Sequence, residues 1–140
     1  MTEAWLTLLQ FADGLFPAGG FAHSFGLETY VQEGVVRDRA GLEAFVTAHL
    51  EGSAGPADAL AAAAGAYLYS TAALLVGAGL RLVALGQVDG QRVLAAMRPR
   101  IARLAAAAAA ASADDMWSFT PGLELASLRH ATLDARLFRS

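Results

Sequence analysis

The chain has 140 residues, of which 56% are apolar and 16% are charged, and its formal net charge is −3. This length allows one domain with its own core, and we expect a single domain over residues 1–140. The ten basic residues are all arginines and are scattered, which excludes the basic stripe of a nucleic-acid surface. Cysteine is absent, which excludes disulfides and zinc-thiolate sites. So few charged residues predict contacts with a protein partner.

Apolar residues recur at helical spacing along nearly the whole chain, and no stretch alternates as a half-buried strand does. A first helix is expected over about 5–12, followed by a loop over 15–22. A short helix over about 23–33 follows, with Gly34 as its left-handed C-terminal residue. Asp38 is placed to cap the next helix. The spacing predicts that this helix buries one face, made of Leu42, Phe45, Val46, His49 and Leu50.

A long apolar helix is expected over about 59–85. Its stretch 59–80 has no charged residue and is long enough to span a bilayer. Much of the stretch is Ala and Gly, and its tyrosines lie near the centre rather than at the edges, so we favour a fully buried core helix. Three glycines predict close approach of a neighbouring helix: Gly65, Gly77 and Gly79.

A further helix follows, which Asp89 is placed to cap, and Pro99 is expected to kink or restart it. Its inward residues are expected to be Val93, Leu94, Met97, Ile101 and Leu104. The alanine-rich run 105–111 has high helix propensity and is expected to continue this helix. After a break over 114–122, a last helix is expected over about 123–136. The predicted fold is all-α, a single-domain bundle of about five to six helices.

No catalytic constellation is found in the sequence. His23 and Ser24 are adjacent, so on a helix they point in different directions, and no G-x-S-x-G elbow is present. For a metal site, His130 and Asp134 stand at i, i+4, and His23 could meet Glu28 by folding. A structural role for the histidines is the favoured interpretation, and His23 and His130 stay weak metal candidates. We therefore expect no enzyme.

Two segments near the ends of the chain carry unusual composition. LFPAGGFAHSFGLE, residues 15–28, places glycines and a proline among aromatic residues. It is interpreted either as a tight connection between helices or as a preformed surface for a partner protein. The segment 136–140 sets Leu137 and Phe138 between two arginines. It is either a solvated end or a peptide with both apolar side chains exposed that orders on binding, and we favour binding.

These two segments resemble the urease accessory protein F (UreF) family. The family's Pro-Gly and Ser-x-Gly-Leu-Glu pattern is matched by Pro17, Gly19, Ser24, Gly26, Leu27 and Glu28. Its C-terminal Arg-His and Arg-Leu-Phe-Arg-Ser units are matched by Arg129, His130, Arg136, Leu137, Phe138, Arg139 and Ser140. Residues 66–91 resemble the family's late helix and the turn after it. Near 61–65 the chain passes directly from the family's early helices to its late ones, so we expect a middle section of the family to be missing.

The resemblance implies a non-enzymatic, cytoplasmic, all-α protein that forms a homodimer and needs no cofactor. Family members bridge the accessory proteins UreD and UreG, and the assembly uses GTP hydrolysis to load nickel into apo-urease. The matched residues of both segments are then partner-binding: Leu137, Phe138 and Arg139 would dock with UreD, and residues 17–28 would shape a surface near the complex interface. Neither nucleic acid nor membrane is implied as a partner. Two alternatives stay open, a small membrane protein that spans with 59–80 and an inactive deletion product of the family.

Overall fold

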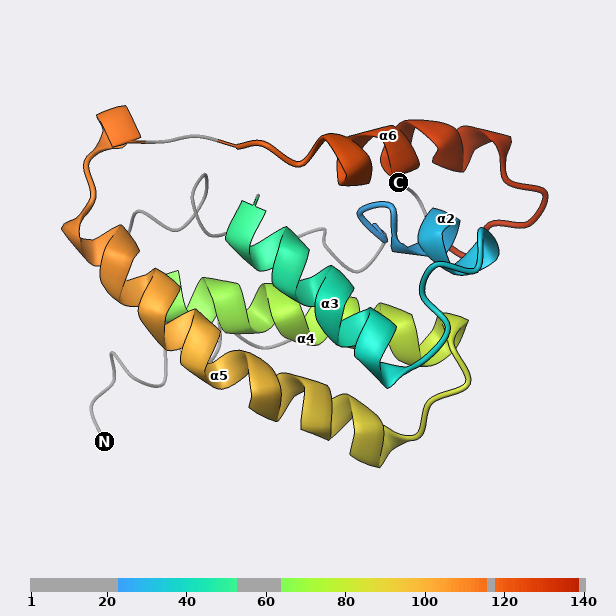
Figure 1. Ribbon diagram of the computed structural model, residues 1–140, viewed down its shortest axis with the longest axis horizontal. Coiled ribbons are helices and arrows are strands. Elements are labelled where there is room, and N and C mark those ends of the chain that lie inside the picture. The colour runs from blue at the N-terminus through green and yellow to red at the C-terminus, as the bar shows by residue number, and fades with distance from the viewer. Residues whose placement is uncertain (1–22, 53–63, 116–117, 139–140) are drawn as a thin grey trace.

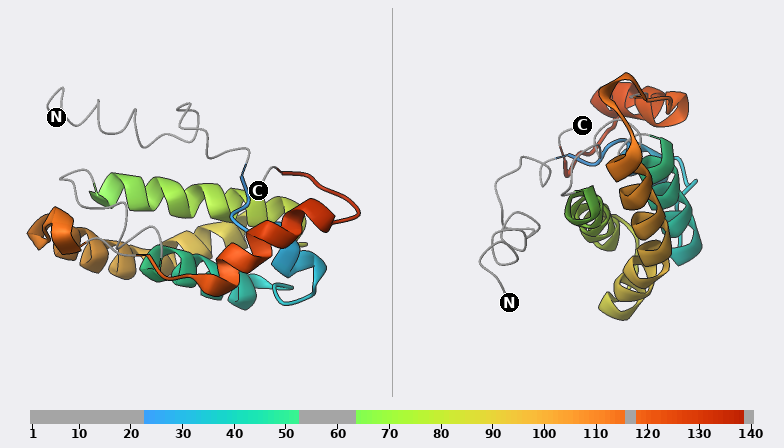
Figure 2. Two further views of the ribbon diagram at one scale, coloured as in Figure 1. Left: turned by 90° about the horizontal axis from the view of Figure 1, so that it is seen from above. Right: turned by 90° about the vertical axis from the view of Figure 1, so that its left-hand side faces the viewer.

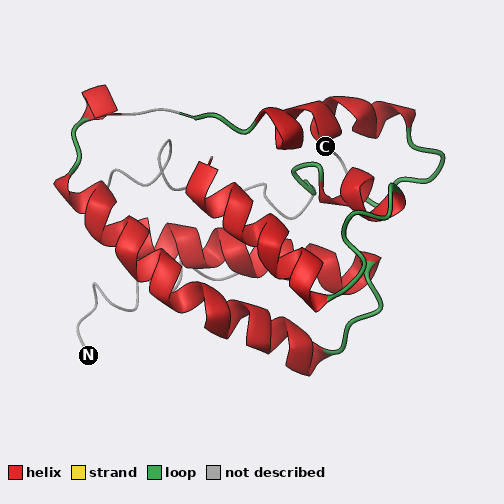
Figure 3. Cartoon of the chain, in the orientation of Figure 1, coloured by secondary structure: helices red, strands yellow, loops and turns green. Residues whose placement is uncertain are grey.

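The computed structural model describes residues 23–52, 64–115 and 118–138. Within these ranges the chain forms five α-helices, α2 to α6, and two short 3-10 helices, with no strand (Figure 3). This confirms the all-α prediction. The helix expected over 5–12 and the loop over 15–22 lie outside the described residues.

The first two described helices begin and end at the residues that local signals favour. Helix α2 (Leu27–Gln32) follows Gly26 and stops before Gly34, whose φ of 72° is the predicted left-handed conformation. The helix starts later than predicted, because residues 24–26 form a turn. Helix α3 (Arg39–His49) is capped as expected by Asp38, whose side-chain oxygen accepts the Gly41 amide at 2.8 Å. The predicted face of α3 is buried throughout.

Helix α4 (Ala64–Leu82) packs one face into the core through residues such as Leu68, Leu75 and Val76. The expectation of a fully buried helix is wrong, since Tyr67 and Tyr69, on either side of Leu68, are exposed. Within the described ranges, no helix is long and apolar enough to cross a membrane.

The predicted close approach at the α4 glycines is confirmed at one position. A Cβ atom added at Gly79 would lie 2.6 Å from both δ-carbons of Leu42, so α3 and α4 approach so closely here that a side chain at this position would displace Leu42. Gly65 has ordinary contact space beside Ala105, and nothing lies within 4 Å of a Cβ at Gly77, so the prediction is wrong there.

Helix α5 (Gln87–Ala110) starts at the N-cap Gly86 rather than at the predicted cap Asp89, which lies in its first turn and pairs with Arg92 at 3.3 Å. The helix runs through Pro99 as one element, so it does not restart there, and the kink stays a prediction. Its alanine-rich end is helical as expected. The predicted inward residues are buried except Leu104, which is half-buried.

Helices α3, α4 and α5 contact one another and enclose the core (Figure 1). Helix α6 (Pro121–Arg129) lies outside this group of three, next to α2, and α2 also contacts α4 (Figure 2). The last helix therefore ends well before the predicted residue 136. A 3-10 turn, His130–Thr132, follows it, and the extended backbone of Leu133 leads the chain back towards α2.

Candidate functional site

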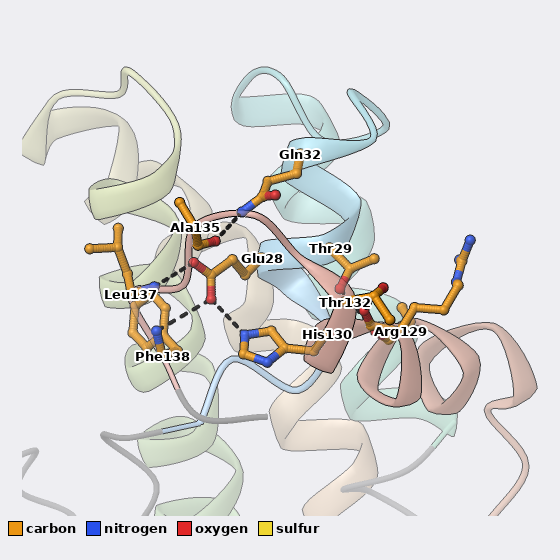
Figure 4. A network of polar contacts seen from close by, with 10 residues as sticks. Glu28, Thr29, Gln32, Arg129, His130, Thr132, Ala135, Leu137 and Phe138 are labelled. Atoms are coloured by element: carbon orange, nitrogen blue, oxygen red, sulfur yellow. Dashed lines mark hydrogen bonds and ion pairs between the residues drawn. The ribbon is translucent and has the colours of Figure 1, made fainter.

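A single buried carboxylate, that of Glu28, joins the two ends of the described chain. Glu28 lies in the first turn of α2 and is only 1% exposed. One of its oxygens, Oε1, accepts the backbone N–H of Leu137 at 2.6 Å, and Oε2 accepts that of Phe138 at 3.3 Å. Oε2 also lies 2.7 Å from Nε2 of the buried His130, 102 residues away in the sequence (Figure 4). We call Glu28, His130, Leu137 and Phe138 the Glu28 junction.

The chemistry of the junction follows from the two backbone donors. An ionised carboxylate only accepts hydrogen bonds, so with Glu28 ionised the Nε2 atom of His130 is the third donor. Burial of a carboxylate is costly unless hydrogen bonds satisfy its oxygens, and three donors do so here. The junction is therefore a closed polar network inside the protein rather than an open reactive site.

Contacts beside the junction bind α2 to the C-terminal part of the chain along the length of the helix. The Thr29 hydroxyl donates to the carbonyl of Ala126 in α6 at 2.9 Å. The Gln32 side chain donates to the carbonyl of Ala135 at 2.7 Å. Arg129 pairs with Glu33 at 2.7 Å on the surface, where an ion pair contributes about 1 kcal/mol or less. The buried hydrogen bonds of Thr29 and Glu28, rather than this surface ion pair, hold the two segments together.

The structure explains the glycine, leucine and glutamate of the Ser-x-Gly-Leu-Glu unit, whereas the buried hydroxyl of Ser24 has no hydrogen-bond partner among the described residues. The Ser24 carbonyl accepts the Leu27 amide at 3.0 Å and so closes the turn that enters α2. Gly26 has a φ of 85°, and a Cβ there would lie 3.0 Å from the carbonyl oxygen of Leu123 in α6. Only glycine fits both the left-handed backbone and the close approach of α6. The next two residues place Leu27 in the core and Glu28 in the junction.

The two apolar residues of the C-terminal segment have opposite environments. Phe138 is 7% exposed and belongs to the core, with the Arg81 guanidinium 4.3 Å from its ring centroid. Leu137 is 70% exposed. The expectation that both side chains are exposed is therefore wrong for Phe138. The segment is attached to the rest of the chain because its backbone amides and its phenyl ring find partners within the protein.

The histidine pairings expected for a metal site do not form. His130 follows the last residue of α6, and the backbone leaves the helical path at Leu133, so His130 and Asp134 do not share a helix face. Glu28 pairs with His130 rather than with His23, which is exposed beside Phe25. In the part of the chain that the structure describes, no group of three or more metal-ligating side chains is present.

The comparisons with known proteins agree on one family. The UreF family model matches residues 59–98. The urease accessory protein UreF of Cereibacter sphaeroides (strain ATCC 17023) is 29% identical over 210 residues, which cover 100% of both chains. The chain belongs to the UreF family. A UreF protein of Rhodopseudomonas palustris (strain BisA53) is 52% identical over 81 residues, or 58% of this chain, and one of Bradyrhizobium (strain BTAi1) is 51% identical over 75 residues, or 54% of it.

This chain is shorter than its UreF relatives. The matched stretches cover 34% of the Rhodopseudomonas protein and 31% of the Bradyrhizobium protein, so the chain spans about a third of their length in these matches. Against the Cereibacter protein, the 140 residues are spread over an alignment of 210. A missing section near 61–65 stays a prediction, since residues 53–63 are not described.

The structure brings together most of the residues that carry the UreF motifs. Glu28 from one end meets His130, Leu137 and Phe138 from the other, and Gly26 lies close to α6. Arg129 pairs with Glu33 beside this region, and Arg136 is exposed. Four predicted site residues lie outside the described residues: Pro17, Gly19, Arg139 and Ser140. The sequence analysis missed Thr29, Gln32 and Arg81. No local signal marks them, because Thr29 and Gln32 bond to carbonyls 97 and 103 residues away.

An open groove of about 520 Å³ lies between α6 and the C-terminal end of α3, beside the turn that enters α2. Its lining includes Phe25, His49, Leu123 and Leu128. Phe25 has a φ of 50°, which is uncommon for a side chain of this size, and its ring packs 5.0 Å from that of His49. Leu125 and Leu128 of α6 are mostly exposed. Exposed apolar side chains grouped on α6 and the C-terminal segment favour contact with another protein.

Proposed function

We propose that this chain is a urease accessory protein that acts as a non-enzymatic scaffold and chaperone. In this role it supports the GTP-dependent incorporation of nickel into the urease active site, as part of a complex with UreD and UreG. Membership of the UreF family supports the role, because the matched relatives are named urease accessory protein UreF. Family membership also supports an accessory role over an enzymatic one. Nickel is the cargo of the assembly in this proposal, with apo-urease as its recipient.

The observation that carries the proposal is that both motif segments meet in the Glu28 junction. Two charged or polar side chains of these segments contact each other inside the protein: Glu28 and His130 are 1% and 2% exposed. The motif residues therefore stabilise the fold rather than catalyse a reaction. The exposed residues are the apolar Leu137 and the basic Arg136, which precedes it in the sequence, together with Leu128 of α6. This pattern fits a protein partner that offers an apolar pocket flanked by carboxylates.

UreD is the partner that we propose for this surface, with UreG and apo-urease joining through the complex. Homodimer formation and a cytoplasmic location are further parts of the proposal, and the likeness to UreF proteins supports both. The groove beside α6, which Leu128 lines, offers a partner a second apolar surface.

Copurification with UreD tests the proposal. Leu137→Asp places a charge on the exposed side chain of the C-terminal segment, and Val88→Asp does the same at an exposed valine of α5 that is 64% exposed. We expect the unmodified chain and Val88→Asp to retain UreD, and Leu137→Asp to weaken binding about tenfold or more, as loss of a central interface side chain does. Equal binding by both variants would remove the C-terminal segment from the interface. Failure of the unmodified chain to bind UreD would contradict the proposed complex.

A further inference from the structure

The segment after the 3-10 turn, residues 133–138, contains no helix, so its position depends on individual contacts. The Leu133 amide closes the turn by donating to the His130 carbonyl at 3.3 Å. Further along, the described contacts are the Gln32 bond to Ala135, the two amide bonds to Glu28, and the Arg81 contact with the Phe138 ring. Glu28 therefore supplies the two backbone contacts nearest the end of the described chain.

The geometry at Glu28 fixes the orientation of this backbone as well as its position. Successive N–H groups of an extended chain point in opposite directions. The N–H groups of Leu137 and Phe138 both point to one carboxylate, which requires a bend that turns successive amides towards the same anion. The bend directs the Phe138 ring inwards below Arg81 and leaves the Leu137 side chain in solvent.

We propose that Glu28 is a positioning residue that holds Leu137 and Arg136 ready for the partner without touching it. The proposal rests on the proposed function, in which this segment contacts UreD. Because Glu28 is buried, it acts through the backbone that it binds. A segment that is already ordered loses less conformational entropy on binding, so the Glu28 bonds strengthen partner affinity. A segment that had to leave Glu28 in order to bind would show the opposite dependence.

Hydrogen exchange of the two amides tests the positioning without any partner. Glu28→Gln keeps the shape of the side chain but replaces one acceptor oxygen by an NH2 donor. The matched control is Glu33→Gln, at the exposed C-cap of the same helix, which removes the ion pair with Arg129. We expect exchange at Leu137 and Phe138 to accelerate roughly tenfold to a hundredfold in Glu28→Gln, while a buried α4 amide such as that of Leu75 keeps its rate. Unchanged exchange at Leu137 and Phe138, or acceleration only in step with Leu75, would overturn the inference.

Titration of the same variants with UreD separates the inference from the proposed function. We expect Glu28→Gln to bind UreD about tenfold more weakly than the unmodified chain and Glu33→Gln to bind equally well. Equal or tighter binding by Glu28→Gln would contradict positioning by Glu28, although the proposed function would stand. Lack of binding by the unmodified chain would refute the proposed function, and the exchange rates would still decide whether Glu28 holds the segment.

Discussion

Replacement of Gly26 by alanine is expected to destabilise the protein strongly, because two independent penalties fall on the same Cβ atom. The backbone has a φ of 85°, and a residue with a side chain in this left-handed region costs about 1–2 kcal/mol. The added Cβ would lie 3.0 Å from the Leu123 carbonyl oxygen and 3.1 Å from the Ala126 Cβ. These atoms belong to a packed helix and cannot rotate away, so overpacking adds about 1–3 kcal/mol.

Replacing glycine also lowers the conformational entropy of the unfolded chain, which offsets about 0.4–1 kcal/mol of the lost stability. The expected net loss for Gly26→Ala is therefore about 3 kcal/mol, or a fall in Tm of roughly 10 °C for a chain of this size. Gly34→Ala separates the two penalties, since φ is 72° but the nearest atoms belong to the flexible Arg37 side chain. We expect it to cost about 1 kcal/mol.

Gly77→Ala is the matched control within the same protein. This glycine lies inside α4, and nothing is within 4 Å of the added Cβ. Alanine is the better helix former, so we expect a gain of about 0.5–1 kcal/mol. Urea unfolding followed by circular dichroism measures all three free energies of unfolding. If Gly26→Ala proved as stable as Gly77→Ala, α6 would not pack against the turn before α2, and the account of the motif glycine would be refuted.

Three further changes test other parts of the structure. Phe138→Ala should lower the free energy of unfolding by about 3 kcal/mol because the ring is buried, whereas Leu137→Ala, at an exposed side chain, should change it by about 0.5 kcal/mol or less in the same urea titration. Gly79→Ala should lower the Tm, because its Cβ would lie 2.6 Å from an α3 leucine side chain and overpacking costs about 1–3 kcal/mol. At Asp115, hydrogen bonds from the backbone N–H and then from the hydroxyl of Ser112 lower the pKa of the carboxyl. The stability that the ionised Asp115 contributes is therefore present above the ordinary aspartate pKa and is lost as pH falls through the lowered pKa. An NMR titration should find that lowered pKa and its partial return towards the ordinary value in Ser112→Ala; identical titrations would contradict the contact.

Most of the helical framework could be predicted from the sequence because it depends on local signals. The apolar spacing of α3 determines its buried face, and Asp38 and Gly34 act within three or four residues of the chain. Helix boundaries were less predictable. The break after α6 arises where the chain turns back to α2, and α5 begins at Gln87, directly after Gly86, rather than after Asp89.

The Glu28 junction could not be predicted from spacing, because its partners are more than one hundred residues apart. The sequence suggested both Glu28 and His130 as site residues but paired them with other groups. Local proximity made Asp134 the apparent partner of His130, and tertiary packing selected Glu28 instead. The burial of Phe138 has the same origin, since an apolar residue near the end of a segment is buried only if the fold offers it a place.

The most direct test of the proposed function is the nickel content and activity of urease in cells that lack their own UreF protein. Expression of this chain is expected to restore nickel-loaded, active urease, and Val88→Asp should restore it equally. Leu137→Asp and Glu28→Gln should restore much less, because they disturb the exposed and the buried side of the same C-terminal segment. A folded, well-expressed chain that leaves urease without nickel would contradict the central claim and would identify the protein as an inactive, shortened member of the family.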